Sequence, residues 1–335
     1  MTTAWIRKGA LLGLLFVAAC TPATADEASD YPAKPIHIIV PFAPGGATDV
    51  ALRLIQPSLA QALGRPLVID NRGGASGAVG MELAAHAQPD GYTLLFGNVG
   101  TISIDPSFFP ELAVRPERDF VPVSIMGETP GILVASPKFP PNAVKEMVAY
   151  VKVHPGKVNY GAAGISTLNS LAMANFRRGA GLEMTQVPYK GGAGPALLDL
   201  IAGNIDVMLV TLSAASSHVK NGQLKALAVT TRERVALLPD VPTFFEQGYP
   251  EDVSSSWQGL FAVAGTPQPI VAKVYAAVVK AMADPNARER MTEAGIVPAS
   301  SPSPEGFKEF LADEAVKWKR VVEQVKAAEK DKGVR

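Results

Sequence analysis

The chain has 335 residues, 47% of them hydrophobic and 19% charged, which indicates a globular protein long enough for two domains. Its 31 basic and 31 acidic residues balance, so the chain has no net charge to attract nucleic acid. A single cysteine excludes a disulfide within the chain, and stability must come from burial of a hydrophobic core.

Residues 1–25 have the pattern of an export signal. Two basic residues precede an apolar run (10–19) that is too short to span a membrane. Two cleavage sites compete. The sequence VAAC resembles a lipobox and would make Cys20 the lipid-modified first residue, whereas ATA before Asp26 fits ordinary signal peptidase. Either cleavage leaves 29 basic and 31 acidic residues, and no later segment is apolar enough to span a membrane.

From Tyr31 onward, short apolar strands alternate with glycine turns and amphipathic helices, as in parallel α/β proteins. In the first block, strands are predicted at 36–40, 66–70 and 92–97, and helices near 47–63 and 76–87.

A proline-rich stretch (106–122) follows, and the alternation then restarts at GILVAS (131–136). Further strands are predicted at 158–162, 184–189, 205–210, 224–230 and 257–265, with helices near 142–153, 167–179, 193–202 and 213–220. The tail is predicted to be helical at 268–283, 285–294 and 304–330. One face of its last helix is apolar and predicts core packing by Phe307, Phe310, Leu311, Trp318, Val321, Val322 and Val325.

Two similar runs, GILVAS and GLFAVAG, stand at the ends of the second block, and we interpret them as strands that cross between two lobes. The first lobe would then comprise residues 31–130 and 256–335, and the second lobe residues 131–255. The C-terminal helices would return to cover the first lobe, and a cleft would lie between the lobes.

Four strand ends run into glycine-rich turns: PGGATD (44–49), GNVGT (97–101), GAAGIST (161–167) and KGGAG (190–194). Ligands of open α/β sheets bind beyond the carboxyl ends of the strands. Glycine permits positive φ and a close approach to backbone N–H groups, and a helix start favours negative charge. The turns therefore indicate an anion site. Each turn alone is equally consistent with a compact βα connection, and we favour a helix-capping role for Asp49.

Signatures of catalysis are scarce. His37, His86, His154 and His218 are scattered without metal-binding spacing, so we expect neither metal nor cofactor. The sequence contains no GxSxG elbow, P-loop or GxGxxG fingerprint, which weakens a hydrolase or dehydrogenase interpretation.

In the glycine turns and the segments around them, the chain resembles the Bug-type periplasmic solute-binding proteins of tripartite tricarboxylate transporters. The matching stretches, in the order of the family, are YPAKPIHIIVPFAPGGATD, LGRPLVIDNRGGASG, PDGYTLLFGNVGT, VPYKGGAGPALLDLIAGNIDVML, GQLKALAVTTRERVALLPDVPTFFEQGYP and SWQGLFAVAGTPQPIVAKV. They span roughly residues 31–330 and together are highly specific.

The resemblance implies an α/β fold of the two-lobed type II periplasmic-binding-protein class, with two crossing strands, that closes on a small carboxylate or related anion. It places ligand contacts in the first lobe at Phe42, Gly45, Gly46, Thr48, Asp49, Gly100 and Thr101. In the second lobe it implies Ala163, Gly164, Ser166, Thr167, Asn169, Lys190 and Gly191, with Ser213 as a further candidate.

Two positions depart from the family pattern. Ser166 stands where the family usually has a second glycine, and Asn169 stands at the usual histidine. In addition, the NRPGAGG stretch of the family reads NRGGASG here. We expect the changes at Ser166 and Asn169 to alter contacts to the ligand. The ligand of any particular family member therefore cannot be assigned to this protein.

The sequence thus predicts a monomeric, exported, non-enzymatic binding protein that captures a small organic anion for membrane transporter subunits. Three alternatives remain open: a ligand sensor for a signalling partner, an exported α/β hydrolase of small esters or amides, and a structural lipoprotein with a decayed cleft. The ligand itself is not determined by the sequence.

Overall fold

The computed structural model describes residues 30–331 except 43, 163–166, 190–192 and 253. Its contacts divide the chain into Met1–Tyr31 and Pro32–Arg335, and all helices and strands described below belong to the second unit. The export signal and Cys20 lie outside the described residues. None of the described helices has both the length and the apolar character needed to cross a membrane.

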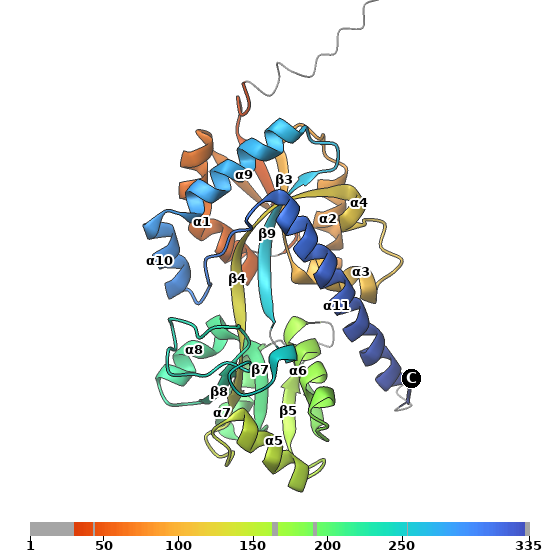
Figure 1. The fold of residues 1–335 in the computed structure, drawn as a ribbon, viewed down its shortest axis with the longest axis vertical. Helices are drawn as coiled ribbons and strands as arrows, with labels where there is room; N and C mark the ends of the chain where they lie inside the picture. The colour runs from red at the N-terminus through yellow and green to blue at the C-terminus, as the bar shows by residue number, and fades with distance from the viewer. Residues whose placement is uncertain (1–29, 43, 163–166, 190–192, 253, 332–335) are drawn as a thin grey trace, which may run out of the picture. The chain divides into compact units, whose positions relative to one another are not determined.

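The second unit is an α/β structure (Figure 1). Its strands are β1 (Ile36–Val40), β2 (Leu67–Asn71), β3 (Thr93–Asn98), β4 (Phe120–Ala135), β5 (Asn159–Ala162), β6 (Thr185–Pro188), β7 (Val207–Thr211), β8 (Lys225–Val229) and β9 (Ser255–Val263). Its helices are α1 (Ala47–Leu63), α2 (Ala78–Ala85), α3 (Asp105–Phe108), α4 (Pro116–Asp119), α5 (Val144–Val153), α6 (Leu168–Gly179), α7 (Ala193–Ala202), α8 (Leu212–Lys220), α9 (Gln268–Met282), α10 (Pro285–Glu293) and α11 (Pro304–Asp331). A π-helical turn, Gly100–Ile104, precedes α3.

Within the described residues the strands form one nine-stranded sheet in the order β2-β1-β3-β9-β4-β7-β5-β6, with β8 also paired to β4. Strands β1, β2 and β3 are parallel to one another, as are β5, β6 and β7. The pairs that involve β4 or β9 are antiparallel. The sheet therefore consists of two parallel groups connected through β4 and β9, which run side by side in Figure 1.

Strand β4 is longer than the sequence predicts, because it begins at Phe120 and not at Gly131. Proline interrupts the hydrogen bonds of a central strand and therefore argues against one. The structure accommodates Pro122 at a shift in the register with β9, and Pro130 at the end of that pairing, opposite Ser255. From Gly131 onward β4 pairs with β7 and β8 instead.

Alternation along β4 divides the apolar side chains between two faces, as expected for a strand. Ile132 and Val134 pack in a cluster with α7 and α8, whereas Leu133 and Ala135 pack in a cluster with α5 and α6. The part of the sheet that contains β5, β6, β7, β8 and the end of β4 is therefore covered by helices on both faces, which is typical of parallel α/β structure.

The other part of the sheet, which contains β1, β2, β3, β9 and the beginning of β4, is covered in part by α11. Its predicted apolar face is confirmed: Phe307, Trp318, Val321 and Val322 are buried in one cluster with Trp257 of β9, and the other predicted members pack against it. The indole N–H groups of Trp257 and Trp318 both donate to one oxygen, Oε2 of Glu314, at 3.0 and 2.8 Å. This carboxylate therefore fixes α11 on the sheet while satisfying both indoles.

Candidate ligand-binding site

The loop between β1 and α1 is held in shape by the carboxylate of Asp49, which is 1% exposed. Its Oδ2 accepts hydrogen bonds from the Gly45 backbone N–H and from Arg53 Nε, each at 2.8 Å. Its Oδ1 accepts one from Asn71 Nδ2 at 3.0 Å, and the same amide group donates to the Phe42 carbonyl at 3.1 Å. The loop is thereby fastened to the end of β2.

The Asp49 carboxylate stays ionised in this position. Burial alone would raise its pKa, but hydrogen bonds from Arg53, the Gly45 amide and Asn71 outweigh burial and lower it below its ordinary value. The charge is paired with Arg53. Asp49 therefore organises the loop from within. It does not cap the first turn of α1 as the sequence suggested, because it binds an N–H that precedes the helix.

The N-terminus of α1 is left without a side-chain cap. Gly46 is its N-cap residue, with φ −73° and ψ 162°, and no side chain of the described residues bonds to this end. The positive φ that the sequence leads one to expect here belongs to Gly45, at +82°. The first N–H groups of a helix have no partner within it, so the start of α1 presents free donors and the positive end of the helix dipole.

The second glycine turn is joined to the first by Asn98, at the end of β3. Asn98 Nδ2 donates to the Thr48 hydroxyl at 3.0 Å, and Asn98 Oδ1 accepts the Thr101 backbone N–H at 3.2 Å. The Thr101 hydroxyl donates to the Asn98 carbonyl, also at 3.2 Å. Both donors of Thr101 are therefore already used, whereas the Thr48 hydroxyl keeps its hydrogen free among the described residues.

The adjacent Gly100 begins the π-helical turn and also lies close to Asn98. A Cβ added at Gly100 would lie 3.1 Å from Asn98 Oδ1. The structure thus brings together all seven residues predicted in the first lobe, and the connection runs through Asn71 and Asn98. Sequence reasoning missed these two asparagines. Each is the last residue of a strand, which was the available signal.

Only part of the predicted second-lobe set can be placed. Ala163, Gly164, Ser166, Lys190 and Gly191 lie outside the described residues. Thr167 is the N-cap of α6, where its hydroxyl accepts from the Ser170 N–H at 3.3 Å and donates to the Ser170 hydroxyl at 2.9 Å.

Asn169, in the first turn of α6, is half-buried beside the point where β4 changes partner. A Cβ added at Gly131 would lie 3.2 Å from Asn169 Oδ1 and 3.0 Å from the Thr230 side chain. Its side-chain amide donors have no partner among the described residues. Asn169 can therefore donate to a ligand without first losing an internal hydrogen bond.

Apolar contacts bring the start of α6 toward the second glycine turn. Leu171, two residues after Asn169, is fully buried in the same cluster as Val99 and Ile102, which flank Gly100 and Thr101. Ser213 is placed elsewhere: it is exposed in the first turn of α8, and a Cβ added at Gly295 would lie 3.4 Å from its backbone. The structure therefore groups Asn169, but not Ser213, with the turn that contains Gly100 and Thr101.

Within the part of the chain that the structure describes, no group of three or more His, Cys, Asp or Glu side chains is placed to hold a metal ion. The chemistry offered by the grouped residues is hydrogen-bond donation from backbone amides, hydroxyls and a side-chain amide. Such donors suit a carboxylate, and they include no activated nucleophile.

Comparison with known proteins matches residues 51–327 to the family described as the tripartite tricarboxylate transporter family receptor. Protein BugT of Bordetella pertussis (strain Tohama I) is 34% identical over 319 residues, which cover 95% of this chain and 97% of BugT.

Two solved structures extend the comparison. MatC from Rhodopseudomonas palustris, solved with malate, is 37% identical, with a TM-score of 0.71 and coverage of 87% of this chain and 100% of MatC. Rpa4515 of R. palustris, solved with adipate, is 30% identical, with a TM-score of 0.75 and coverage of 88% and 98%.

The fold and the donor groups, together with these comparisons, define a periplasmic solute-binding protein of the two-lobed type and not an enzyme. The chain belongs to the tripartite tricarboxylate transporter receptor family, which includes the Bug proteins. The family resemblance drawn from the sequence is thereby confirmed.

Proposed function

We propose that the protein captures a small dicarboxylate and delivers it to the membrane subunits of a tripartite tricarboxylate transporter. The observation that carries the proposal is the uncapped start of α1, with Gly46 at the N-cap and the Asp49 charge already paired with Arg53. A helix start of this kind binds carboxylates through backbone N–H groups without a cationic side chain.

One carboxylate of the ligand would bind at this helix start. The N–H groups of the first turn and the Thr48 hydroxyl are the donors, and Asn98 orients that hydroxyl by donating to its oxygen. A hydrogen bond to a charged group contributes about 1.5–3 kcal/mol, so two or three such bonds contribute about 3–9 kcal/mol. Micromolar binding corresponds to about 8.2 kcal/mol, so contacts to the other end of the ligand are needed as well.

The other end of the ligand would be bound by the second lobe. Asn169, whose Oδ1 would lie 3.2 Å from a Cβ at Gly131, is the described candidate that supports this contact. The other candidates of the family pattern in this lobe include Ala163, Gly164, Ser166, Lys190 and Gly191, which lie outside the described residues. Asn169 stands where the family usually has histidine. It donates from a neutral amide at any pH, so we expect binding that does not depend on a histidine titration.

We infer the lobe boundaries from the sheet. Residues 31–130 and 256–335 would form the first lobe and residues 131–255 the second, because β4 exchanges β9 for β7 and β8 between Pro130 and Gly131. Closure of the lobes would then bend the chain near Gly131 and Ser255. We expect the protein to act as a monomer.

The class of ligand follows from the relatives. MatC was solved with malate and Rpa4515 with adipate, which are dicarboxylates of different length. A site built from backbone donors recognises carboxylate groups, while the spacing between the two lobes selects the length of the acid. We therefore favour dicarboxylates over amino acids or amides.

We also infer that residues 1–25 direct export. Cleavage before Cys20 would give a lipid-anchored protein, and cleavage before Asp26 a free one. The intact mass of the protein purified from its native host distinguishes them. A lipid adduct on Cys20 supports the anchor, and a chain that begins at Asp26 contradicts it.

A thermal-shift screen of the protein without its signal tests the ligand assignment. We expect malate, adipate or a dicarboxylate of similar length to raise the melting temperature. An acid at 100 times its dissociation constant adds about 2.7 kcal/mol to stability. Monoamides of the same acids, which have one carboxylate fewer, are the matched controls. Flat melting curves for all dicarboxylates would contradict the proposal.

A further inference from the structure

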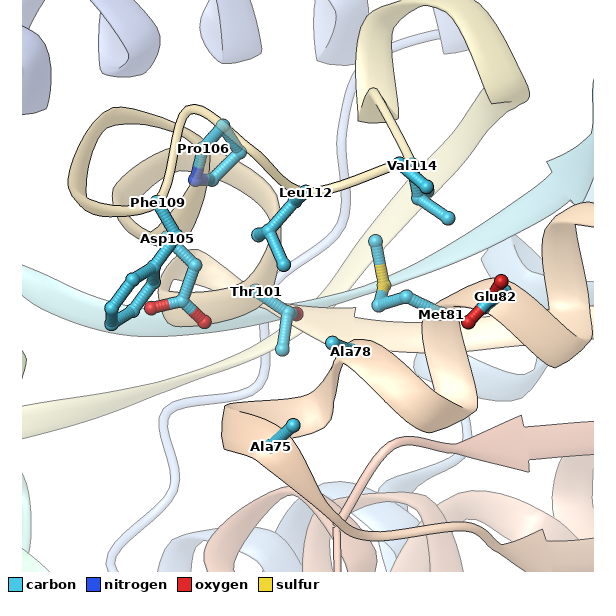
Figure 2. A pocket seen from close by; sticks show the side chains of 11 residues that line it. Ala75, Ala78, Met81, Glu82, Thr101, Asp105, Pro106, Phe109, Leu112 and Val114 are labelled. Atoms are coloured by element: carbon cyan, nitrogen blue, oxygen red, sulfur yellow. The ribbon is translucent and has the colours of Figure 1, made fainter.

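A cavity of about 90 Å³ lies between α2 and the segment that contains α3, outside the loop that precedes α1 (Figure 2). Thr101 is one of its lining residues, but the Thr101 hydroxyl and N–H are bonded to Asn98. The rest of the lining within the described residues comes from 75–82 and 105–114. The cavity is therefore a separate space beside the proposed carboxylate site.

The walls of the cavity are mostly apolar. They are formed by Ala75, Ala78, Met81, Pro106, Phe109, Leu112, Ala113 and Val114. A cavity of roughly 150 Å³ lined by such residues binds benzene, so this smaller one fits an aliphatic chain of about three or four carbons.

The charged groups of the lining are both acids. Asp105 lies at one end beside Thr101, and Glu82 of α2 lies at the other end, as Figure 2 shows. Asp105 is only 8% exposed, and no hydrogen-bond donor or cation of the described residues contacts its carboxyl group. A buried carboxyl without a partner is costly in the ionised form, which a bound cation would stabilise.

The other charged groups near α3 are engaged with backbone carbonyls. Lys326 of α11 donates to two carbonyls of α3, and Arg115 donates to the carbonyl of Pro110. Neither of these cations neutralises Asp105. Burial accordingly raises the pKa of Asp105 to about 7.

We propose that this cavity binds a small aliphatic ammonium ion, with its charged group against Asp105 and its carbon chain against Met81 and Leu112. An organic cation fits better than a metal ion, because the walls are apolar and the described residues offer no group of three metal-ligating acids. The aromatic ring of Phe109 adds a favourable surface for a cation.

Binding of the ammonium ion should be linked to ionisation of Asp105. Below pH 7 the carboxyl must first lose its proton, so affinity falls as the pH falls. With a pKa near 7, the ionised fraction differs about tenfold between pH 6 and pH 8. Glu82, at the exposed end of the cavity, adds electrostatic attraction of the same sign.

The test is an NMR titration of the ¹⁵N-labelled protein with n-propylammonium chloride at pH 6 and pH 8, following amide shifts of residues 75–82 and 101–114. The matched ligands are 1-propanol and propionate. We expect saturable shifts with propylammonium, about tenfold tighter binding at pH 8, and no saturable binding of the two controls. Equal binding of 1-propanol would mean that the cavity recognises only the apolar chain, and would overturn the proposal.

Two variants and a control complete the test. Asp105→Asn keeps the shape and removes the charge, and Ala78→Leu fills the cavity and leaves Asp105 in place. Both should abolish binding, while Asp313→Asn, which removes an exposed acid of α11, should not change it. Unchanged affinity in folded Asp105→Asn would mean that the charge of Asp105 does not bind the ammonium ion. No saturable shift in the wild type at pH 8 would mean that the cavity takes up no ammonium ion, and either result would overturn the proposal.

Discussion

The side-chain amide of Asn98 donates a 3.0 Å hydrogen bond to the hydroxyl of Thr48, which lies fifty residues earlier in the chain. The same side chain accepts the Thr101 N–H. One asparagine at the end of β3 therefore joins two glycine turns that come from different strands. The hydrogen of the Thr48 hydroxyl has no acceptor among the described residues, and we propose that it donates to the ligand.

Replacement of Asn98 should uncouple these turns. In Asn98→Ala the Thr48 hydroxyl and the Thr101 N–H each lose their partner, and we expect stability to fall by about 1–3 kcal/mol. Affinity for the dicarboxylate should fall about tenfold, because Thr48 no longer has a fixed orientation. Urea unfolding and calorimetric titration measure the two effects. Asn286→Ala, at an exposed residue of α10, is the control, and equal behaviour of the two variants would refute the role of Asn98.

Asp49→Ala should destabilise the protein by about 2–3 kcal/mol, since it leaves the Gly45 N–H and the Arg53 guanidinium without their acceptor. Asp49→Asn retains an acceptor and should cost less. Chemical denaturation at neutral pH compares the two variants. A cost for Asp49→Ala below about 0.5 kcal/mol would mean that the loop does not depend on this carboxylate.

The contribution of Asp49 should also depend on pH. Its folded pKa is lower than that of an unfolded aspartate, so its stabilising effect is present above the unfolded pKa, about 3.9, and is lost as the pH falls through the folded pKa. The difference in stability between wild type and Asp49→Asn should therefore shrink below pH 4. A difference that stays constant down to pH 2 would contradict the assigned pKa direction.

Asp105 should show the opposite dependence. Because its folded pKa, about 7, lies above the unfolded value, about 3.9, the folded state loses stability as the pH rises from 4 to 7. The three-unit difference corresponds to about 4 kcal/mol. Asp105→Asn should thus be more stable than wild type at pH 8 and similar to it at pH 4, by melting temperature. Asp313→Asn serves as the control for loss of an exposed acid, and a pH-independent effect of Asp105→Asn would disprove the burial argument.

Closure of the two proposed lobes predicts a more compact protein with ligand. Binding energy favours the closed state over the open one, so small-angle scattering should give a smaller radius of gyration at saturating dicarboxylate. Gly46→Val at the same ligand concentration should remain open. Identical scattering of the wild type with and without saturating ligand would indicate a rigid cleft.

The sequence predicted the strands and helices well where the periodicity was strong. Helix α1 coincides with the predicted 47–63, because its apolar residues recur at helical spacing and Gly64 ends it in the left-handed conformation that glycine allows. Strand β4 was predicted only from residue 131. Its earlier part contains Pro122, which lies at a shift in register, and Pro130, which lies at the change of partner, and sequence spacing does not reveal such positions.

The candidate site was predictable in its glycine turns but not in its supporting contacts. Gly46 and Thr48 follow from the strand–turn–helix pattern around α1. Asn71 and Asn98 act on residues that are far away in sequence, and only the parallel sheet brings the ends of β1, β2 and β3 together. Gly80 of α2 is a second example, because its position within a helix does not reveal which distant residues lie beside it. In the structure a Cβ there would lie 2.7 Å from Cα of Pro41, in the loop itself.

The central claim is that the N-terminus of α1 binds a ligand carboxylate, and Gly46→Val tests it most directly. The backbone of Gly46 lies in the extended region, which valine adopts without strain, so the variant should fold. Its branched side chain would obstruct the approach of a carboxylate to the first-turn N–H groups. Gly179→Val is the matched control, because Gly179 is exposed and a Cβ there meets nothing within 4 Å.

The decisive measurement is calorimetric titration of wild type, Gly46→Val and Gly179→Val with the dicarboxylate that gives the largest thermal shift. Loss of one charge-assisted hydrogen bond costs about 1.5–3 kcal/mol, or roughly 10- to 150-fold in affinity. We predict that loss for Gly46→Val, together with one-to-one binding and unchanged affinity for Gly179→Val. A folded Gly46→Val protein that binds the acid as tightly as wild type would contradict the assignment of the ligand to the start of α1.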